Sequence, residues 1–315
     1  MSLNTLVSIL FITFFGAVQA QVSLPKVVHG RVERIENFES KYVTARNIDV
    51  WLPQGYSDTS KYAVLYMHDG QMIYDSEAEA AWNKQSWDVD DAIAELLKKD
   101  KIKKVIVVGI WNGGATRHFD YFPQKPFENL SQVKKDTVRA QLRKVGIANK
   151  DFQPTSDNYL QFLVKELKPM IDKKYAVLTD RENTFIMGSS MGGLISFYAI
   201  SEYPKVFGGA ACLSTHWPGA FTLANNPIPF AFQNYLLKQL PCPENHKIYF
   251  DCGDVTLDAL YPKIQQKVDK IMTQKGYSAS NWQTRYFPGE NHSENAWKKR
   301  VHIPLEFLLK KTQKN

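Results

Sequence analysis

The chain has 315 residues, of which 44% are hydrophobic and 23% are charged, fractions that exclude a disordered or collagen-like chain. Three cysteines are too few for a disulfide-rich scaffold, and their odd number leaves at least one thiol outside any intramolecular disulfide. The net charge of +7 comes from scattered lysines and arginines without a nucleic-acid-binding motif, so we expect no nucleic-acid partner.

Residues 1–20 are predicted to be a signal peptide. Residues 6–17 form a short apolar run without charge, and Val18-Gln19-Ala20 follows with small or neutral residues at the positions that a signal peptidase reads. The run is too short for a comfortable membrane span. An uncleaved N-terminal anchor is the alternative, because no Lys or Arg precedes the run. We therefore expect an exported protein, periplasmic or secreted, with no stable membrane span after cleavage.

Strands and helices are predicted to alternate along the rest of the chain. An antiparallel pair over 27–38 and 42–52 opens it, and the apolar runs at 62–68 and 104–110 are typical of strands buried on both faces. Further strands are expected at 183–187, 208–213, 247–252 and 283–287, and helices at 89–99, 159–171, 191–203, 257–276 and 293–311. This alternation indicates an α/β fold with a mainly parallel sheet and helices on both faces.

One polar segment interrupts the alternation. Residues 123–156 contain Pro126 and Pro154 and have only weak helical spacing. We predict that this segment is an excursion or lid over the active site, within a single domain that covers residues 21–315. The sequence has no internal repeat that would indicate a solenoid or a propeller.

Gly188-Ser189-Ser190-Met191-Gly192 matches the pattern G-x-S-x-G between an expected strand and an expected helix. That context is the one in which the motif presents a nucleophilic serine. Glycines are needed beside so tight a turn, and the helix N-terminus favours developing negative charge. The alternative is a glycine-rich turn without catalysis. The flanking elements favour Ser190 as a nucleophile.

A serine nucleophile needs a base, and His292 is the predicted one. It lies in the loop that leaves the last expected strand, at the same edge of the sheet as Ser190. Three other histidines follow Ser190. His302 lies within the last helix, His246 precedes a strand at the opposite edge, and His216 is a candidate for lining the pocket.

The acid of the triad is expected between the serine and the histidine in the chain. Asp258 is preferred and Asp254 is the alternative, because both lie in the loop after the strand 247–252. Asp258 has an alternative role as a helix cap, and Asp254 as a turn residue. Asp251 lies within the strand and Asp269 on a helix face, so neither is favoured.

The tetrahedral intermediate needs hydrogen-bond donors for its oxyanion. One is expected to be the backbone N–H of Met191, which follows the nucleophile, and the other comes from the loop after the strand 62–68. Gly70 lets that loop turn inward. The backbone N–H of Gln71 is therefore the predicted second donor.

Four stretches together resemble the putative esterase family of α/β-hydrolases: Tyr66-Met67-His68-Asp69-Gly70-Gln71, Gly109-Ile110-Trp111-Asn112, Gly188-Ser189-Ser190-Met191-Gly192-Gly193 and Gly289-Glu290-Asn291-His292-Ser293-Glu294. The resemblance covers residues 27–310, with the enterochelin-esterase-like branch the most similar. Other relatives include feruloyl and acetyl xylan esterases, esterase D and mycolyltransferases. The resemblance to the family implies the α/β-hydrolase fold, and it implies the same nucleophile, base and oxyanion donors as predicted above. It also implies an acid after the penultimate strand. The family often has threonine after the glycine that matches Gly253. Asp254 stands there, so the resemblance leaves the acid open.

Six side chains near the catalytic edge are predicted to bind substrate: Trp111, Asn112, Arg117, Tyr121, His216 and Trp217. The aromatic rings among them are expected either to stack on a sugar or aromatic acyl group or to pack beneath the segment 123–156. Arg117 is expected either to bind a carboxylate or to pair with Asp120 or Glu128.

The sequence therefore predicts an exported serine esterase that acts through an acyl-enzyme on small-molecule or glycan-linked esters, such as those of carbohydrates, hydroxycinnamates or siderophores. Acyl transfer by the same triad and a non-catalytic glycan-binding protein are the alternatives. No metal-ligand spacing and no phosphate-binding glycine loop is present, so no metal or cofactor is expected. The sequence carries no signal for the oligomeric state.

Overall fold

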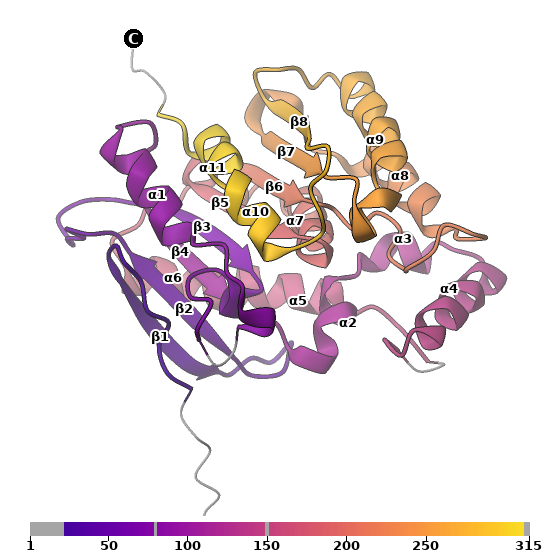
Figure 1. Ribbon diagram of the computed structural model, residues 1–315, viewed down its shortest axis with the longest axis horizontal. Coiled ribbons are helices and arrows are strands. Elements are labelled where there is room, and N and C mark those ends of the chain that lie inside the picture. Colours follow the sequence, from indigo (N-terminus) through magenta and orange to yellow (C-terminus); the bar gives the residue numbers. More distant parts are fainter. Residues whose placement is uncertain (1–21, 79–80, 149–150, 312–315) are drawn as a thin grey trace, which may run out of the picture.

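The computed structural model describes residues 22–78, 81–148 and 151–311. Its centre is an eight-stranded sheet in the order β1-β2-β4-β3-β5-β6-β7-β8 (Figure 1). β1 (Arg31–Phe38) pairs antiparallel with β2 (Arg46–Leu52), which is antiparallel to β4 (Val105–Ile110). The parallel strands that join β4 are β3 (Ala63–His68), β5 (Thr184–Ser189), β6 (Gly209–Leu213), β7 (Lys247–Cys252) and β8 (Trp282–Tyr286). The predicted α/β fold, mainly parallel with an antiparallel opening pair, is confirmed.

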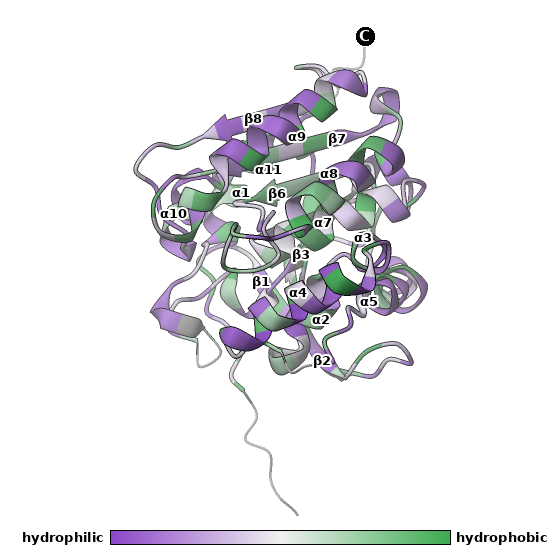
Figure 2. Cartoon of the chain, turned by 90° about the vertical axis from the view of Figure 1, so that its right-hand side faces the viewer, coloured by the Kyte–Doolittle hydropathy of each residue, from purple (hydrophilic) through white to green (hydrophobic). Residues whose placement is uncertain are grey.

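Helices cover both faces of the sheet because its inner strands are apolar on both sides. One face carries α1 (Val89–Lys98), α10 (Glu294–Arg300) and α11 (His302–Leu309). The other carries α2 (Arg117–Tyr121), α3 (Gln124–Glu128), α4 (Gln132–Lys144), α5 (Ser156–Phe162), α6 (Lys168–Lys174), α7 (Met191–Glu202), α8 (Ile228–Gln239) and α9 (Pro262–Gln274). Figure 2 shows β6 mainly in green beside helices such as α9, whose residues are part purple and part green.

Helix α7 is the most enclosed of these helices. All of its residues except the last are buried, and it packs on β5 and β6 with α2 and α8 on its other sides. A helix that is apolar all round belongs in the interior of a domain. The residue that precedes it is therefore held on a rigid support.

Two of the predicted helices are each divided. The expected helix 257–276 consists of a 3₁₀ turn over Thr256–Leu260 and of α9, which begins at Pro262. Proline has no N–H to donate, so it favours the first turn of a helix over its interior. The expected helix 293–311 divides in the same way into α10 and α11, with Pro304 in the first turn of α11. The first division places Asp258 in a short turn rather than at the start of the long helix.

The segment 123–156 is more helical than expected. It contains α3 and α4, and its apolar side chains Phe127, Val138 and Phe152 are buried in the core on the α7 side of the sheet. Helix α8, which the sequence analysis did not predict, packs beside α3 and α9. The role of the segment as a lid stays a prediction.

Within the described ranges, no helix has the length and apolar character needed to cross a membrane. The predicted signal peptide lies outside the described residues. Cys212, Cys242 and Cys252 are all free thiols.

Candidate active site

Ser190 occupies a sharp turn between β5 and α7. Its φ is 57° and its ψ is −120°. This backbone conformation raises the conformational free energy of a residue with a side chain. The turn depends on Gly188, because a Cβ there would lie 2.8 Å from the backbone carbonyl carbon of Gly192. Backbone hydrogen bonds from Ser190 N to Leu213 O (2.9 Å) and from His216 N to Ser190 O (3.1 Å) hold the turn against β6. The strained conformation is thus fixed from both sides, and Ser190 lines a cavity at the carboxyl end of the sheet.

His292 lies beside Asp258 at the same edge of the sheet. The distance from His292 Nδ1 to Asp258 Oδ1 is 2.6 Å, and the Asp258 side chain is fully buried. Its other oxygen, Oδ2, accepts hydrogen bonds from Ser214 Oγ (2.6 Å) and from the backbone N of Gly253 (2.7 Å). An ionised carboxylate only accepts, so this contact assigns the imidazole proton to Nδ1 and leaves Nε2 as the basic nitrogen.

Asp254 has hydrogen-bond partners other than His292. Its carboxylate accepts hydrogen bonds from the Tyr286 hydroxyl (2.6 Å) and from the backbone N of Gly289 (2.7 Å). These two bonds lower the pKa of Asp254. Asp254 thus ties the loop after β7 to the loop after β8, and of the two candidate acids the structure brings only Asp258 to the histidine.

A buried polar cluster supports Asp258 from behind. Ser214 Oγ, which donates to Asp258, accepts hydrogen bonds from Trp297 Nε1 (3.0 Å) and Arg300 Nη2 (2.9 Å). Arg300 also forms an ion pair with Asp251 at 3.0 Å, and both side chains are almost completely buried. Burial raises the pKa of Asp251, although Arg300 opposes this shift. This cluster was not predicted, and its one signal in the sequence is a carboxylate inside an apolar strand.

The two predicted oxyanion donors belong to segments that touch. A Cβ on Gly192 would lie 3.4 Å from Asp69 Oδ2, so the loop after β3 rests on the first turn of α7. Gly70 lies so close to β4 that its Cβ would be 2.4 Å from the carbonyl carbon of Gly109. Gln71 and Ser190 line the same cavity. The role of the Gln71 and Met191 backbone N–H groups as oxyanion donors stays a prediction.

The cavity beside Ser190 has a volume of about 460 Å³. Apolar side chains make part of its wall, and the rings of Trp87 and Trp297 lie 5.3 Å apart. Polar side chains make much of the rest: Asp69, Gln71, Asn83, Gln85, Asn112, Arg117, Ser190, His292, Ser293 and Glu294. Burial, together with the neighbouring Asp69, raises the pKa of Glu294. Such a cavity has both an apolar surface and hydrogen-bonding groups for a ligand.

Arg117 and Asn112 line this cavity, in the position expected for substrate-binding residues. Arg117 makes a two-point ion pair with Asp69, with Nε to Oδ1 at 2.6 Å and Nη2 to Oδ2 at 2.8 Å. Asn112 Nδ2 donates to the same carboxylate at 2.7 Å. Burial alone would raise the pKa of Asp69, but Arg117 and Asn112 hold it below its usual value. Arg117 therefore pairs with neither of the expected carboxylates, and Asp120 binds Arg46 instead.

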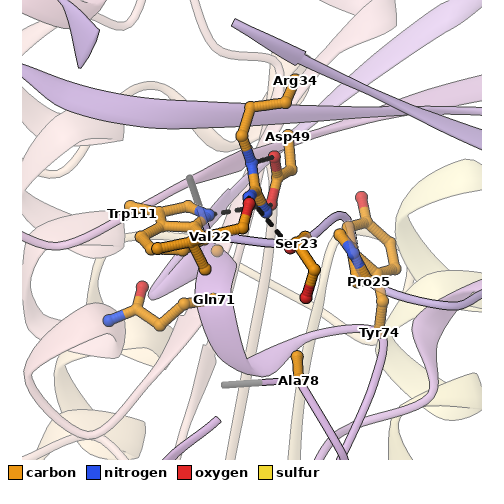
Figure 3. A pocket seen from close by; sticks show the side chains of 10 residues that line it. Val22, Ser23, Pro25, Arg34, Asp49, Gln71, Tyr74, Ala78 and Trp111 are labelled. Carbon is orange, nitrogen blue, oxygen red and sulfur yellow. Dashed lines mark hydrogen bonds and ion pairs between the residues drawn. The ribbon is translucent and has the colours of Figure 1, made fainter. Parts of the chain in front are cut away.

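The other four predicted substrate-binding side chains lie elsewhere. Trp111 donates to Asp49 at 2.8 Å, stacks on Arg34 and faces a separate small cavity (Figure 3). Tyr121, His216 and Trp217 are buried in the interior. An aromatic residue after a strand is equally able to fill the core or line a pocket, and here Tyr121 and Trp217 belong to the core on the α7 side of the sheet.

Comparison with known proteins gives a family match and several distant relatives. The family described as putative esterase matches residues 41–307. The uncharacterized protein YbbA of Bacillus subtilis is 22% identical over 174 residues, which are 55% of this chain and 58% of YbbA. The carboxylesterase SOBER1 of Arabidopsis thaliana is 25% identical over 165 residues, 52% of this chain and 72% of that protein. The match therefore spans less than two thirds of YbbA.

Among solved structures, a ferulic acid esterase from the anaerobic fungus Anaeromyces mucronatus superposes with a TM-score of 0.59 and 20% identity. The alignment covers 91% of this chain and 92% of that one. At this identity the likeness concerns the fold, and it confirms the expected α/β-hydrolase fold.

Proposed function

The chain belongs to the putative esterase family, and on that premise we propose that it hydrolyses carboxylic esters with Ser190, His292 and Asp258 as its catalytic triad. The observation that carries the proposal is the 2.6 Å contact between His292 Nδ1 and the buried Asp258 carboxylate, next to a serine in a strained turn. Strained backbone conformations of this kind cluster at active sites.

In the acylation half of the reaction, His292 Nε2 takes the hydroxyl proton of Ser190 while Oγ attacks the ester carbonyl carbon. Asp258 stabilises the imidazolium that forms. The backbone N–H groups of Gln71 and Met191 receive the oxyanion. His292 then gives its proton to the departing alcohol, and an acyl-enzyme remains on Ser190.

In the deacylation half, His292 Nε2 accepts a proton from a water molecule, whose oxygen attacks the acyl carbon. The second tetrahedral intermediate uses the same two N–H donors. When it collapses, the carboxylic acid leaves and the proton returns to Ser190 Oγ, so the enzyme is restored without any cofactor.

The proposed substrates are small-molecule or glycan-linked esters with an aromatic or hydroxylated part. The apolar wall at Trp87 and Trp297 suits an aromatic group, and the amides of Asn83, Gln85 and Asn112 suit hydroxyls. The likeness to a ferulic acid esterase supports hydroxycinnamate esters within this class. The apolar run at residues 6–17 supports export of the protein, which we keep as part of the proposal.

The test is labelling with a fluorophosphonate probe, read as intact mass, together with hydrolysis of p-nitrophenyl acetate. We expect one adduct on the parent and none on Ser190→Ala. Asp258→Asn should hydrolyse the ester about 10³- to 10⁴-fold more slowly, because the imidazole loses its orienting partner. The matched variant Asp254→Asn should keep the parent rate. A Ser190→Ala protein with unchanged esterase activity, or equal losses in the two aspartate variants, would overturn the proposal.

A further inference from the structure

A basic groove lies on the face of the sheet that carries α11. It has a volume of about 550 Å³, and β7, β8 and α11 supply most of its lining residues. Its basic side chains are Lys101, Lys247, Arg285, His302 and Lys310. In the described part of the chain, no residue of this groove also lines the cavity beside Ser190. The groove is therefore a second candidate binding site.

The positive charges of the groove outnumber its negative ones. Glu306 is the one carboxylate among the described lining residues, and it pairs with Lys101 at 2.9 Å. Lys247, Arg285 and Lys310 form no side-chain hydrogen bond or ion pair with the rest of the described chain. Burial, and then the neighbouring charge of Lys310, lower the pKa of Lys247. An anion bound between these side chains would offset their repulsion.

The fold collects these residues from distant parts of the sequence. Lys101 follows α1, Lys247 begins β7 and Lys310 follows α11. Charged side chains on an edge strand also prevent pairing with another chain, and Arg285 on β8 has that position. Lys247 has no such role, because β7 is paired on both sides, with β6 and β8. Protection of the edge strand therefore leaves Lys247 and Lys310 unexplained.

We propose that this groove binds an acidic sugar chain, whose carboxylates pair with Lys247, Arg285 and Lys310. The proposal goes beyond the proposed ester hydrolysis, and binding in the groove does not depend on Ser190. A chain bound here would keep the protein on an acidic glycan, while the separate cavity beside Ser190 acts on ester groups. The net charge of +7 adds a general attraction to such a polymer.

The other lining residues favour a sugar chain over a lipid surface. Ser280 and Gln283 supply hydrogen-bonding groups for hydroxyls. Phe307 adds an apolar surface, and its ring centroid lies 6.0 Å from Lys247 Nζ. A bilayer is bound by an apolar face that enters the headgroup region. The apolar side chains of this groove, Ile303 and Phe307, are instead partly buried against the core.

The experiment is isothermal titration calorimetry of the full chain with a trimer of galacturonic acid, and with a neutral galactose trimer for comparison. We expect the acidic trimer to bind at least about tenfold more tightly than the neutral one, and to lose affinity as salt is added. Lys247→Met/Lys310→Met should weaken this binding about 5- to 25-fold, because two charge pairs are lost. Lys267→Met/Lys270→Met is the matched control, since it removes the same charge from exposed positions on α9. It should change the affinity less than about twofold.

Circular dichroism shows whether each variant is folded. If the groove variant does not fold, Arg285→Gln at an exposed position of β8 decides the question, and it should weaken binding about two- to fivefold. Equal affinity for the two trimers, or equal weakening in the groove and control variants, overturns the proposal. Tighter binding to phosphatidylglycerol vesicles or to inorganic phosphate than to the acidic trimer overturns the choice of a glycan. Failure of the proposed ester hydrolysis would show separately, as a parent protein that a fluorophosphonate does not label.

Discussion

Replacing Arg300 by Met is expected to destabilise the protein by about 3–5 kcal/mol, because it leaves the buried Asp251 charge without its partner. Arg300 donates to Asp251 Oδ1 (3.0 Å) and Oδ2 (3.2 Å) and to Ser214 Oγ (2.9 Å), and all of these bonds are lost. At about 2–4 °C for each kcal/mol, Tm should fall by about 6–20 °C. The double variant Asp251→Asn/Arg300→Met removes both charges and should recover much of the loss.

The assay is thermal unfolding followed by circular dichroism at about pH 5 and about pH 8. Without Arg300, the folded state binds a proton at Asp251 more tightly than the unfolded chain does. Stability is then lost as the pH rises through the pKa of the folded state. The difference in unfolding free energy between Arg300→Met and the parent should therefore be smaller at the lower pH. Lys299→Met, which breaks the more exposed pair with Glu290, is the control and should cost no more than about 1 kcal/mol. A loss below about 1 kcal/mol in Arg300→Met, with no dependence on pH, refutes the reasoning.

Three further substitutions test neighbouring features. Ser214→Ala removes one hydrogen bond to Asp258 and should lower kcat about 5- to 10-fold with KM unchanged, measured with p-nitrophenyl acetate. Gly188→Ala places a methyl group 2.8 Å from the Gly192 backbone and should abolish labelling by a fluorophosphonate; unchanged labelling would contradict the tight turn. Burial raises the pKa of Asp90 to about 6, so its carboxylate costs stability as the pH rises from about 4 through 6. Asp90→Asn should therefore stabilise the protein by about 1 kcal/mol at pH 8 and by less at pH 4, as read from urea unfolding.

The central part of the fold was predictable because its strands are short apolar runs. The expected strand 247–252 agrees with β7 at both ends, and the run at 104–110 agrees with β4 within one residue. The division of the two long helices was harder to predict from the sequence. Helical spacing continues across Pro262, and only the turn that precedes it in the structure shows that the long helix begins there.

The candidate site was predictable where a motif fixes the local backbone. The glycines around Ser190 dictate one turn, and the end of the last strand dictates the edge at which His292 lies. The choice between Asp254 and Asp258 depended on how a loop folds, and both residues have hydrogen-bonded roles there. The contact between Arg300 and Ser214 joins residues that are 86 positions apart. No local pattern in a single sequence reports such a pair.

The strand order gives the candidate nucleophile and its base supports of different stability. Ser190 follows β5, which has strand neighbours on both sides. His292 follows β8, which in the described part of the chain is the last strand and pairs only with β7 (Figure 1). Edge elements with few partners open at a lower free energy than the centre of a domain. Opening of β8 would carry the imidazole away from the serine while the rest of the sheet remained intact. We therefore expect heating to separate the imidazole from the serine at the outer edge of the sheet, below the temperature at which the molecule unfolds.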